Sequence, residues 1–279
     1  MSGINTCLFP VAGYGTRFLP ATKAIPKEML PILTKPLIQY GVEEAMSAGM
    51  SHMTMVTSKH KQAIKQHFEP HEDIEACVRG TAKELLLNDV NRASDYCDFS
   101  YIEQQQMLGL GHAIYTGKPL VGSEPFAVIL PDDLCTNEGD SVLTQMTRLH
   151  AKHPDCCIVA IEEVPMSEVD KYGVIDGDLL EGSSDSYRVN SMVEKPSPED
   201  APTNLAIIGR YILTPEIFDV LEETSPDKNG EIQITDALMT LAKQGKVIAY
   251  KFEGARFDCG SVKGFVEATN EFAKLQGII

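Results

Sequence analysis

The segment 7–33, CLFPVAGYGTRFLPATKAIPKEMLPIL, constrains the fold of this chain more than any other, because an apolar run leads directly into a glycine-containing turn. The run at 7–12 has the pattern of a buried strand that enters a parallel sheet. Gly13 and Gly15 follow it, and glycine allows a sharp turn and a close approach of the backbone to a ligand. Three prolines then restrict the rest of the segment. The segment therefore predicts a strand, a turn that faces a ligand and a stiff loop.

The turn is basic although the protein as a whole is acidic. Residues 1–40 carry four basic side chains and one acidic side chain, a net charge of +3, whereas the chain of 279 residues carries −16; these side chains are Arg17, Lys23, Lys27, Lys35 and Glu28. A strand followed by a turn with free backbone N–H groups and cations is typical of phosphate binding. Two familiar phosphate motifs are absent, because Phe18 replaces the third glycine of a dinucleotide fingerprint and no P-loop sequence occurs. From the residues alone, a tight turn with a solvated basic face remains the alternative.

The composition bounds the remaining possibilities. A chain with 43% hydrophobic residues can bury a large core, as one α/β domain or two small ones. The net charge of −16 disfavours nucleic acid and an anionic membrane as partners. No stretch approaches the ~18 apolar residues that a membrane span needs. The seven cysteines form no CxxC pair, so they predict free thiols and a cytoplasmic protein.

Apolar strands alternate with amphipathic helices through the first half of the chain. This alternation predicts an α/β fold of Rossmann-like type, in which helices wrap a mixed, mainly parallel central sheet. The expected strands are 52–58, 99–104, 125–133 and 156–164, and the expected helices start at Pro36 and at about 60–68, 72–90 and 140–152. Ligands bind at the carboxyl ends of parallel strands. We therefore expect one site that combines residues 13–27, 104–111 and 132–133.

Shorter strands and further helices fill the second half. Strands are expected at 172–180, 187–196, 204–213 and 247–254, helices at about 215–223 and 231–243, and a C-terminal helix that starts at DCGS, 258–261. No linker or internal repeat separates the halves, so we expect one domain, 1–279. The apolar stripe of the C-terminal helix predicts a homo-oligomer, a homodimer or homotetramer, although a helix packed on its own chain gives the same pattern.

Two acidic positions suggest a metal site. Asp132 and Asp133 end a buried apolar strand, where adjacent carboxylates repel each other unless a cation or solvent compensates. Mg²⁺ takes oxygen ligands and commonly uses one or two carboxylates plus substrate phosphates. Asp258, before Cys259 and Gly260, could supply a second carboxylate. An Asp-rich turn and an ordinary helix start remain the alternatives for these positions.

The turn GYGTRFLPATKAIPKEMLPI, 13–32, resembles the signature loop of the nucleotide-diphospho-sugar pyrophosphorylases, most closely their bacterial uridylyltransferase branch. Further matches extend to about residue 270. The resemblance implies an enzyme that transfers uridylyl from UTP to glucose 1-phosphate, giving UDP-glucose and pyrophosphate, by direct in-line attack with Mg²⁺. It also implies a nucleotide-binding half, 1–165, a sugar-binding half, 166–260, and a C-terminal helix, 261–279.

The resemblance also assigns residues to roles. Arg17 and Lys27 are implied to be catalytic, and Asp132 and Asp258 to hold the metal. The residues implied to bind the nucleotide are Ala12, Gly13, Gly15, Thr16, Gln104, Gly109 and Asp133, with Gln104 and Gly109 at the uracil. The residues implied to bind the sugar phosphate are Tyr172, Gly173, Glu194 and Lys195. Lys23 is a possible helper, His112 is expected near the nucleotide without a catalytic role, and His60, His67 and His71 are expected at the surface.

Three other readings are weaker. Another sugar-1-phosphate nucleotidyltransferase, such as a glucose-1-phosphate thymidylyltransferase, is disfavoured because the resemblance places a shorter stretch between the arginine and the Pro-Lys pair in those families. A catalytically silent binding module is expected to lose the loop cations or a metal carboxylate, and all are present. A nicotinamide-dependent oxidoreductase lacks both the third glycine and an acidic residue after the second strand.

Overall fold

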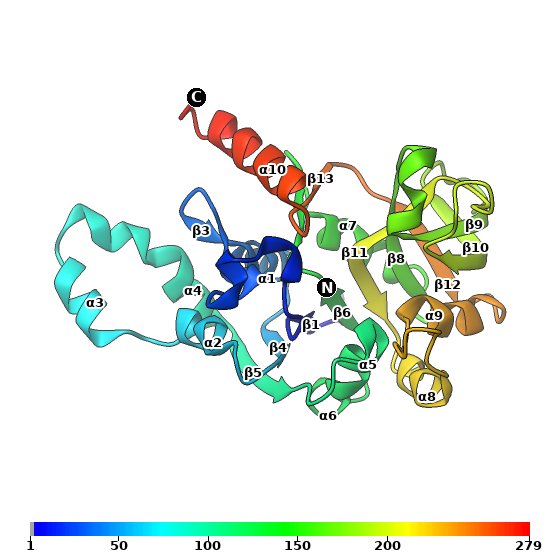
Figure 1. Ribbon diagram of the computed structural model, residues 1–279, viewed down its shortest axis with the longest axis horizontal. Helices are drawn as coiled ribbons and strands as arrows, with labels where there is room; N and C mark the ends of the chain where they lie inside the picture. The colour runs from blue at the N-terminus through cyan, green and yellow to red at the C-terminus, as the bar shows by residue number, and fades with distance from the viewer. Residues whose placement is uncertain (1–2) are drawn as a thin grey trace.

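The computed structural model describes residues 3–279, without the side chain of Asp89, and nine of its strands form one sheet (Figure 1). The sheet order is β5-β4-β1-β6-β11-β8-β12-β10-β9. The strands are β1 (Thr6–Pro10), β4 (His52–Thr57), β5 (Asp98–Glu103), β6 (Phe126–Ile129), β8 (Cys157–Glu163), β9 (Gly173–Leu179), β10 (Ser186–Glu194), β11 (Leu205–Leu213) and β12 (Val247–Lys251).

Parallel pairing dominates the first half of the chain. Strands β5, β4, β1 and β6 are all parallel, as are β8 and β12, whereas β11 runs antiparallel between β6 and β8 and the pairs β9–β10 and β10–β12 are antiparallel. The predicted α/β fold with a mixed central sheet is therefore confirmed. Strand β11, which belongs to the predicted sugar-binding half, lies between β6 and β8 of the predicted nucleotide-binding half, so the two halves share one sheet.

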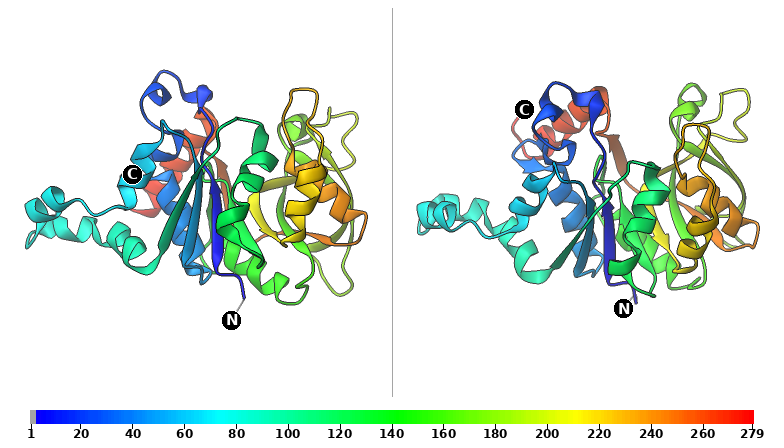
Figure 2. Two further views of the ribbon diagram at one scale, coloured as in Figure 1. Left: turned by 90° about the horizontal axis from the view of Figure 1, so that it is seen from below. Right: turned by 60° about the horizontal axis from the view of Figure 1, so that its bottom comes forward.

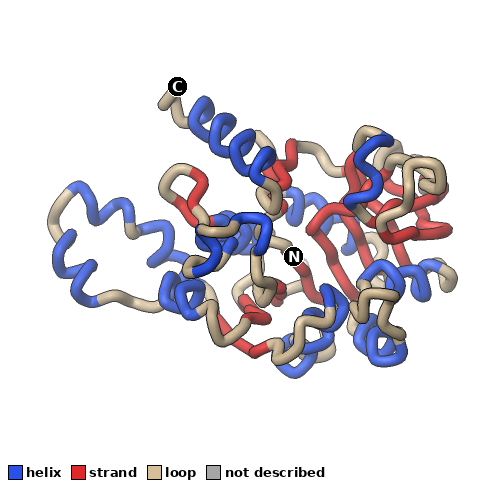
Figure 3. The backbone as a smooth tube through the Cα atoms, in the orientation of Figure 1, coloured by secondary structure: helices blue, strands red, loops and turns tan. Residues whose placement is uncertain are grey.

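Helices cover both faces of the sheet (Figures 1 and 3). They are α1 (Leu37–Ser47), α2 (Gln62–Phe68), α3 (Glu72–Val78), α4 (Asn88–Tyr96), α5 (Gly109–Thr116), α6 (Lys118–Val121), α7 (Val142–His150), α8 (Glu216–Glu223), α9 (Ile234–Ala242) and α10 (Val262–Leu275). Neighbouring residues of β1 point to opposite faces. Leu8 belongs to a core cluster that includes residues of α5, α8 and α9, and Phe9 belongs to a second cluster that includes residues of α1, α2 and α7. Within the described residues, no helix is long and apolar enough to cross a membrane.

The helix predicted at 72–90 is wrong in its extent. The structure has α3, a short 3₁₀ turn at Ala82–Leu86 and then α4. Gly80, between α3 and the 3₁₀ turn, has φ +74°, a left-handed conformation that ends a helix. This segment, cyan in Figure 1, extends away from the sheet in all views (Figures 1 and 2).

The strand predicted at 125–133 ends earlier, at Ile129, and Asp133 begins a separate strand, β7 (Asp133–Thr136). This strand pairs antiparallel with β13 (Ala255–Asp258), which the sequence did not predict, and Asp258 lies opposite Asp133 in the register. The C-terminal helix α10 then begins as predicted, with the Ser261 hydroxyl accepting from the Gly264 N–H at 3.1 Å. The β7–β13 pair therefore brings the two predicted acidic segments together. A second short pair, β2 (Pro31–Ile32) with β3 (Lys35–Pro36), closes the loop after the glycine turn.

Helix α10 packs partly on its own chain. Phe265 contacts Phe18 with ring centroids 5.6 Å apart, and Phe272 contacts Tyr40 at 5.1 Å. Figure 2 shows this red helix beside the dark-blue segment that follows β1. Part of the stripe that predicted an oligomer is therefore covered within the chain, and the helix supports the glycine turn from outside.

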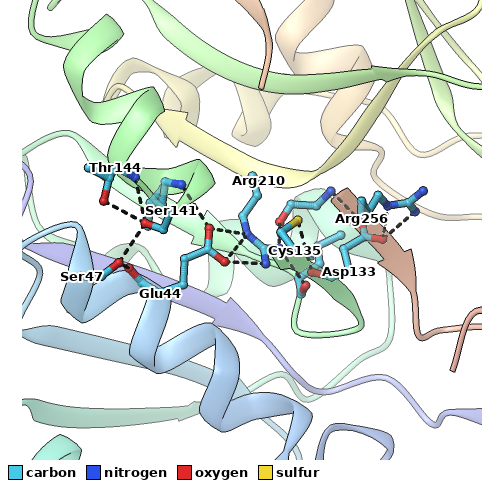
Figure 4. Close-up of polar contacts among 11 residues, drawn as sticks. Glu44, Ser47, Asp133, Cys135, Ser141, Thr144, Arg210 and Arg256 are labelled. Atoms are coloured by element: carbon cyan, nitrogen blue, oxygen red, sulfur yellow. Dashed lines mark hydrogen bonds and ion pairs between the residues drawn. The ribbon is translucent and has the colours of Figure 1, made fainter. Parts of the chain in front are cut away.

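A buried ion pair ties α1 to the central strand β11 (Figure 4). Both Nε and Nη2 of Arg210 donate to the Glu44 carboxylate, at distances of 2.8–3.1 Å, and the arginine is 1% exposed. Nη1 of Arg210 also donates to the carbonyls of Gly209, at 3.0 Å, and Leu130, at 3.3 Å. Glu44 in turn accepts from the N–H of Leu143 at the start of α7. The pair therefore links α1, β11 and α7 close to the point where β6 ends.

Replacing Glu44 by glutamine should destabilise the fold strongly. Glu44→Gln leaves the buried Arg210 guanidinium without a carboxylate, and we expect the free energy of unfolding to fall by about 3–5 kcal/mol, measured by urea unfolding. As a control, Glu267→Gln removes the exposed pair with Lys263 on α10, which is expected to change it by less than about 1 kcal/mol. Equal small effects of the two substitutions would contradict the structural role of Glu44.

Candidate active site

The glycine turn after β1 folds back against Lys27. Gly15 has φ +66°, and a Cβ there would lie 3.0 Å from Cβ of Lys27. The Thr22 hydroxyl donates to the Gly15 carbonyl at 2.7 Å, and three short 3₁₀ turns form the rest of the loop. Glycine is therefore required at position 15 for both conformation and space.

Lys27 and Asp132 form an ion pair between this loop and the turn that joins β6 to β7. Nζ of Lys27 lies 2.5 Å from Oδ2 of Asp132. Burial alone would lower the pKa of Lys27 and raise that of Asp132, but their mutual attraction outweighs it. The pKa of Lys27 is therefore raised and that of Asp132 is lowered, and both side chains are charged.

A second ion pair, missed by the sequence analysis, lies beneath Lys27. Glu28 is 1% exposed and accepts from Nζ of Lys61 at 2.7 and 2.8 Å. Burial raises the pKa of Glu28 and lowers that of Lys61. Because Lys61 lies just before α2, this pair fixes the backbone of Lys27 to the scaffold. The segment TSKHK, 57–61, contained no signal that distinguished Lys61 from a surface lysine.

Three of the predicted residues meet around Gly260. A Cβ on Gly260 would lie 2.9 Å from Oδ2 of Asp132, 3.0 Å from Oδ1 of Asp258 and 3.4 Å from Nη1 of Arg17. The N–H of Gly260 donates to the same oxygen of Asp258 at 3.1 Å. Two carboxylates and one guanidinium from distant parts of the sequence therefore face one small volume, which a side chain at position 260 would fill.

The carboxylates at this point can accommodate a divalent cation. Burial raises the pKa of Asp258, and the neighbouring charges of Asp133 and Asp132 raise it further, although Arg256 and Arg17 oppose them. An added cation would relieve this repulsion. Among the described residues no group of three or more His, Cys, Asp or Glu side chains forms a complete metal site. Two carboxylates suit Mg²⁺, which takes its other oxygens from substrate phosphates and water.

Asp133 is engaged by the protein itself (Figure 4). Its Oδ2 accepts from the Gly209 N–H at 2.7 Å, and its Oδ1 accepts from Nε of Arg256 at 2.7 Å. Arg256 also pairs with Glu162 at 2.5 Å and donates to the hydroxyl of Tyr172 at 3.3 Å. A direct contact of Asp133 with a nucleotide remains a prediction. Arg256 was not predicted from the sequence, where its only signal was its place two residues before Asp258, on the same face of β13.

Two cavities meet at Asp132, and together they are lined by all of the predicted site residues. The first has a volume of about 400 Å³ and is lined by Ala12, Gly13, Gly15, Thr16, Lys27, Gln104, Gly109 and Asp132, among others. The second has a volume of about 600 Å³ and is lined by Arg17, Asp132, Asp133, Tyr172, Gly173, Glu194, Lys195 and Asp258, among others. A larger cavity of about 840 Å³, between α7 and the turn 181–185, contains none of the predicted residues.

The second cavity ends at a hydrogen-bonded carboxylate. Oε2 of Glu194 accepts from the hydroxyl of Thr235 at 2.6 Å, and Nζ of Lys195 lies 3.5 Å from Oε1. A Cβ on Gly173 would lie 3.2 Å from this carboxylate, so glycine leaves room beside it. Lys195 has φ +45°, an unusual conformation for a lysine and one that clusters at functional sites. Thr235, at the start of α9, is a further residue that the sequence analysis missed.

The first cavity ends at an amide. Gln104 follows β5 and is 5% exposed, and its Nε2 lies 2.8 Å from Nδ1 of His112 and 3.4 Å from the Gly109 carbonyl. Gly109 has φ +92°, and a Cβ there would lie 2.9 Å from the Ile232 carbonyl. The turn before α5 is therefore held tightly against the segment before α9.

The remaining predictions concern residues outside both cavities. Lys23 is exposed and lines neither of them. His60 and His71 are exposed as predicted. His67 was predicted to lie at the surface, but it is half-buried, packs edge-to-face against Phe68 and contacts Oε1 of Gln39 at 2.9 Å. All seven cysteines are free thiols, as predicted.

Comparisons with known proteins identify proteins that are similar to this chain. A model of the nucleotidyl transferase family matches residues 11–274. The chain is 60% identical over 268 residues to a UTP–glucose-1-phosphate uridylyltransferase of Pseudomonas aeruginosa, which covers 96% of this chain and 95% of that protein. A crystal structure of apo UDP-glucose pyrophosphorylase superposes with a TM-score of 0.94 at 58% identity, covering 98% of this chain and 99% of that one. A UDP-glucose pyrophosphorylase complexed with UDP-glucose superposes with a TM-score of 0.89 at 56% identity, covering 97% and 99%.

The two carboxylates beside Gly260 should affect stability in opposite directions. The pKa of Asp132 is lowered from 3.8, so its contribution to stability is present above that pH and is lost as the pH falls through its folded pKa. The pKa of Asp258 is raised from 3.8, so its contribution is present below that pH and is lost as the pH rises through its folded pKa.

At pH 7 without divalent cations, we therefore expect Asp132→Asn to lower the free energy of unfolding by about 1–3 kcal/mol. Asp258→Asn should raise it by up to about 1 kcal/mol, because asparagine keeps the oxygen that accepts from Gly260 and removes the repelled charge. Urea unfolding of the two variants measures this difference. A loss of stability in both would contradict the assigned charge balance.

Proposed function

Because the chain belongs to the nucleotidyl transferase family, we propose that its two joined cavities bind a nucleotide and a sugar phosphate side by side. It is an enzyme that transfers the uridylyl group of UTP to glucose 1-phosphate, giving UDP-glucose and pyrophosphate. The observation that carries the proposed mechanism is the convergence of Lys27, Arg17, Asp132 and Asp258 where the cavities meet. In this proposal residues 1–165 supply most of the nucleotide site and residues 166–260 most of the sugar site.

The reaction needs alignment and charge compensation more than proton transfer. A phosphate oxygen of glucose 1-phosphate attacks the α-phosphorus of UTP, and the bond to pyrophosphate breaks in line with it. The nucleophile is already an anion, so no general base is required. The barrier is the repulsion between the two substrates and the charge on the leaving group, which fixed cations lower.

Arg17 and Lys27 are the cations that supply this compensation. Lys27 is held in the charged form by Asp132, and the Glu28–Lys61 pair fixes its backbone. It would exchange Asp132 for a phosphate oxygen when UTP enters the first cavity. Arg17 is exposed and lines the second cavity, so it can reach phosphate oxygens at the junction without displacing a partner. We assign the leaving pyrophosphate to these two side chains together.

Asp132 and Asp258 are the proposed ligands of Mg²⁺. Their oxygens face the same volume beside Gly260. A magnesium ion held there supplies positive charge between the two phosphate-bearing substrates. Asp133 and Arg256 hold β7 and β13 together behind the site, so the two carboxylates keep their separation.

The polar ends of the cavities are proposed to recognise the sugar and the base. Glu194 can accept from sugar hydroxyls, oriented by Thr235, and Lys195 can pair with the phosphate of glucose 1-phosphate. Gln104 and Gly109 are proposed to face the uracil, and the glycine turn 12–16 to face the triphosphate.

We further propose a cytoplasmic homo-oligomer, a homodimer or homotetramer. The free thiols suit a reducing compartment. On α10, Val262, Val266 and Leu275 are 58%, 51% and 65% exposed, and such side chains favour contact with a second subunit.

Removing either loop cation should slow turnover strongly and leave the fold intact. We expect Arg17→Ala and Lys27→Met each to lower kcat by about 10²–10³-fold, because each removes charge that stabilises the leaving pyrophosphate. Lys23→Met is the matched control, since Lys23 belongs to the same loop but lines neither cavity, and it should stay within about threefold of the parent enzyme. Pyrophosphate release measures kcat, and circular dichroism checks the fold. Near-normal turnover of Arg17→Ala would overturn its assignment.

The activity itself is tested with purified enzyme, UTP and glucose 1-phosphate. Pyrophosphate release should require both substrates and Mg²⁺, and a chelator should stop it. UTP should be used in preference to dTTP. If release proceeded equally well without glucose 1-phosphate, or only with dTTP, the proposed function would be wrong.

A further inference from the structure

The orientation of the Gln104 amide is set by its neighbours. One end of this amide faces the carbonyl of Gly109, at 3.4 Å, and Nδ1 of His112, at 2.8 Å. A backbone carbonyl only accepts hydrogen bonds, so the end that faces it must be the NH₂ group. The contact with Gly109 therefore identifies the nitrogen end of the amide without reference to the state of the histidine.

The same contact determines the tautomer of His112. Because the Gln104 nitrogen donates, Nδ1 of His112 must accept, and the proton of the neutral ring is on Nε2. Burial lowers the pKa of His112, which keeps the ring neutral. The opposite protonation, on Nδ1, would place two donors against each other.

The oxygen end of Gln104 is left for a ligand. Among the residues that the structure describes, none donates to Oε1 of Gln104, although the residue is only 5% exposed. Gln104 lines the first cavity, whereas His112 does not. His112 therefore acts from behind the cavity wall, on the side of the amide away from the ligand.

We propose that His112 is a positioning residue for base specificity, which holds the Gln104 amide so that its oxygen accepts from the N3–H of uracil. This rests on the proposed function, in which the base of UTP occupies the first cavity. Cytosine has a lone pair at N3 in place of the N–H. Two hydrogen-bond acceptors, N3 of cytosine and Oε1 of Gln104, would then face each other. Thymine keeps the N3–H, so this device separates UTP from CTP and not UTP from dTTP.

Two variants of one size test the proposal. His112→Leu removes the acceptor and lets the amide rotate, whereas His112→Asn keeps an oxygen close to the position of Nδ1. The measurement is kcat/KM for UTP and for CTP, each with glucose 1-phosphate. We expect the UTP-to-CTP ratio to fall about tenfold in His112→Leu and to stay within about threefold of the parent in His112→Asn. His67→Leu is the control, because it removes another half-buried histidine–glutamine contact outside the site.

The result separates the inference from the proposed function. If the parent enzyme does not use UTP, the proposed function fails. If it does, and His112→Leu keeps the parent's UTP-to-CTP ratio, the role of His112 is wrong.

A measurement on the unsubstituted enzyme keeps the test decisive if His112→Leu does not fold. Nitrogen-15 NMR of the histidine rings should show His112 protonated on Nε2 and unprotonated on Nδ1. A proton on Nδ1 would reverse the amide and overturn the proposal.

Discussion

Repulsion between like charges is the constraint on which the rest of this structure depends. Asp132, Asp133 and Asp258 lie together at the edge of the sheet, where two phosphate-bearing substrates are proposed to bind. Each carboxylate has a different compensation: Lys27 pairs with Asp132, Arg256 pairs with Asp133, and Asp258 is left with a raised pKa. Two of the three charges are thus paired within the protein, and the third is the one for which we propose a bound cation.

Rigid supports hold these charges at fixed positions. Behind the glycine loop, Glu28 and Lys61 form a buried pair, and behind β6 and β7 the Glu44–Arg210 pair joins α1 to β11. Buried pairs of this kind contribute less to net stability than to a defined geometry, because their attraction is offset by the cost of removing both charges from water. The Glu28–Lys61 pair therefore supports the backbone next to Lys27, whose side chain stays partly exposed.

Close approach of backbone to side chain is the second requirement. Gly260 leaves the space that Asp132, Asp258 and Arg17 share, and Gly209 lets its own N–H reach Asp133, since a Cβ there would lie 2.7 Å from the Asp133 carboxylate. Both glycines have ordinary backbone angles, so space and not conformational freedom explains them. At the base end of the site, the Gly109 carbonyl and Nδ1 of His112 both face the amide nitrogen of Gln104, and together they fix the orientation of that amide.

The sequence by itself determined the local features: the apolar strands, the glycine turn with its cations, the adjacent Asp132 and Asp133 and the mixed α/β fold. These follow from periodicity, charge and backbone preference, which act between residues close in the chain. Only the tertiary structure decided which of these features meet. The β7–β13 pairing that places Asp258 beside Asp133 joins residues more than a hundred positions apart, and no local pattern marked β13 as a strand. Lys61, Arg256, Thr235 and the orienting role of His112 were likewise invisible, because a polar side chain acquires its role from the partners that packing brings to it.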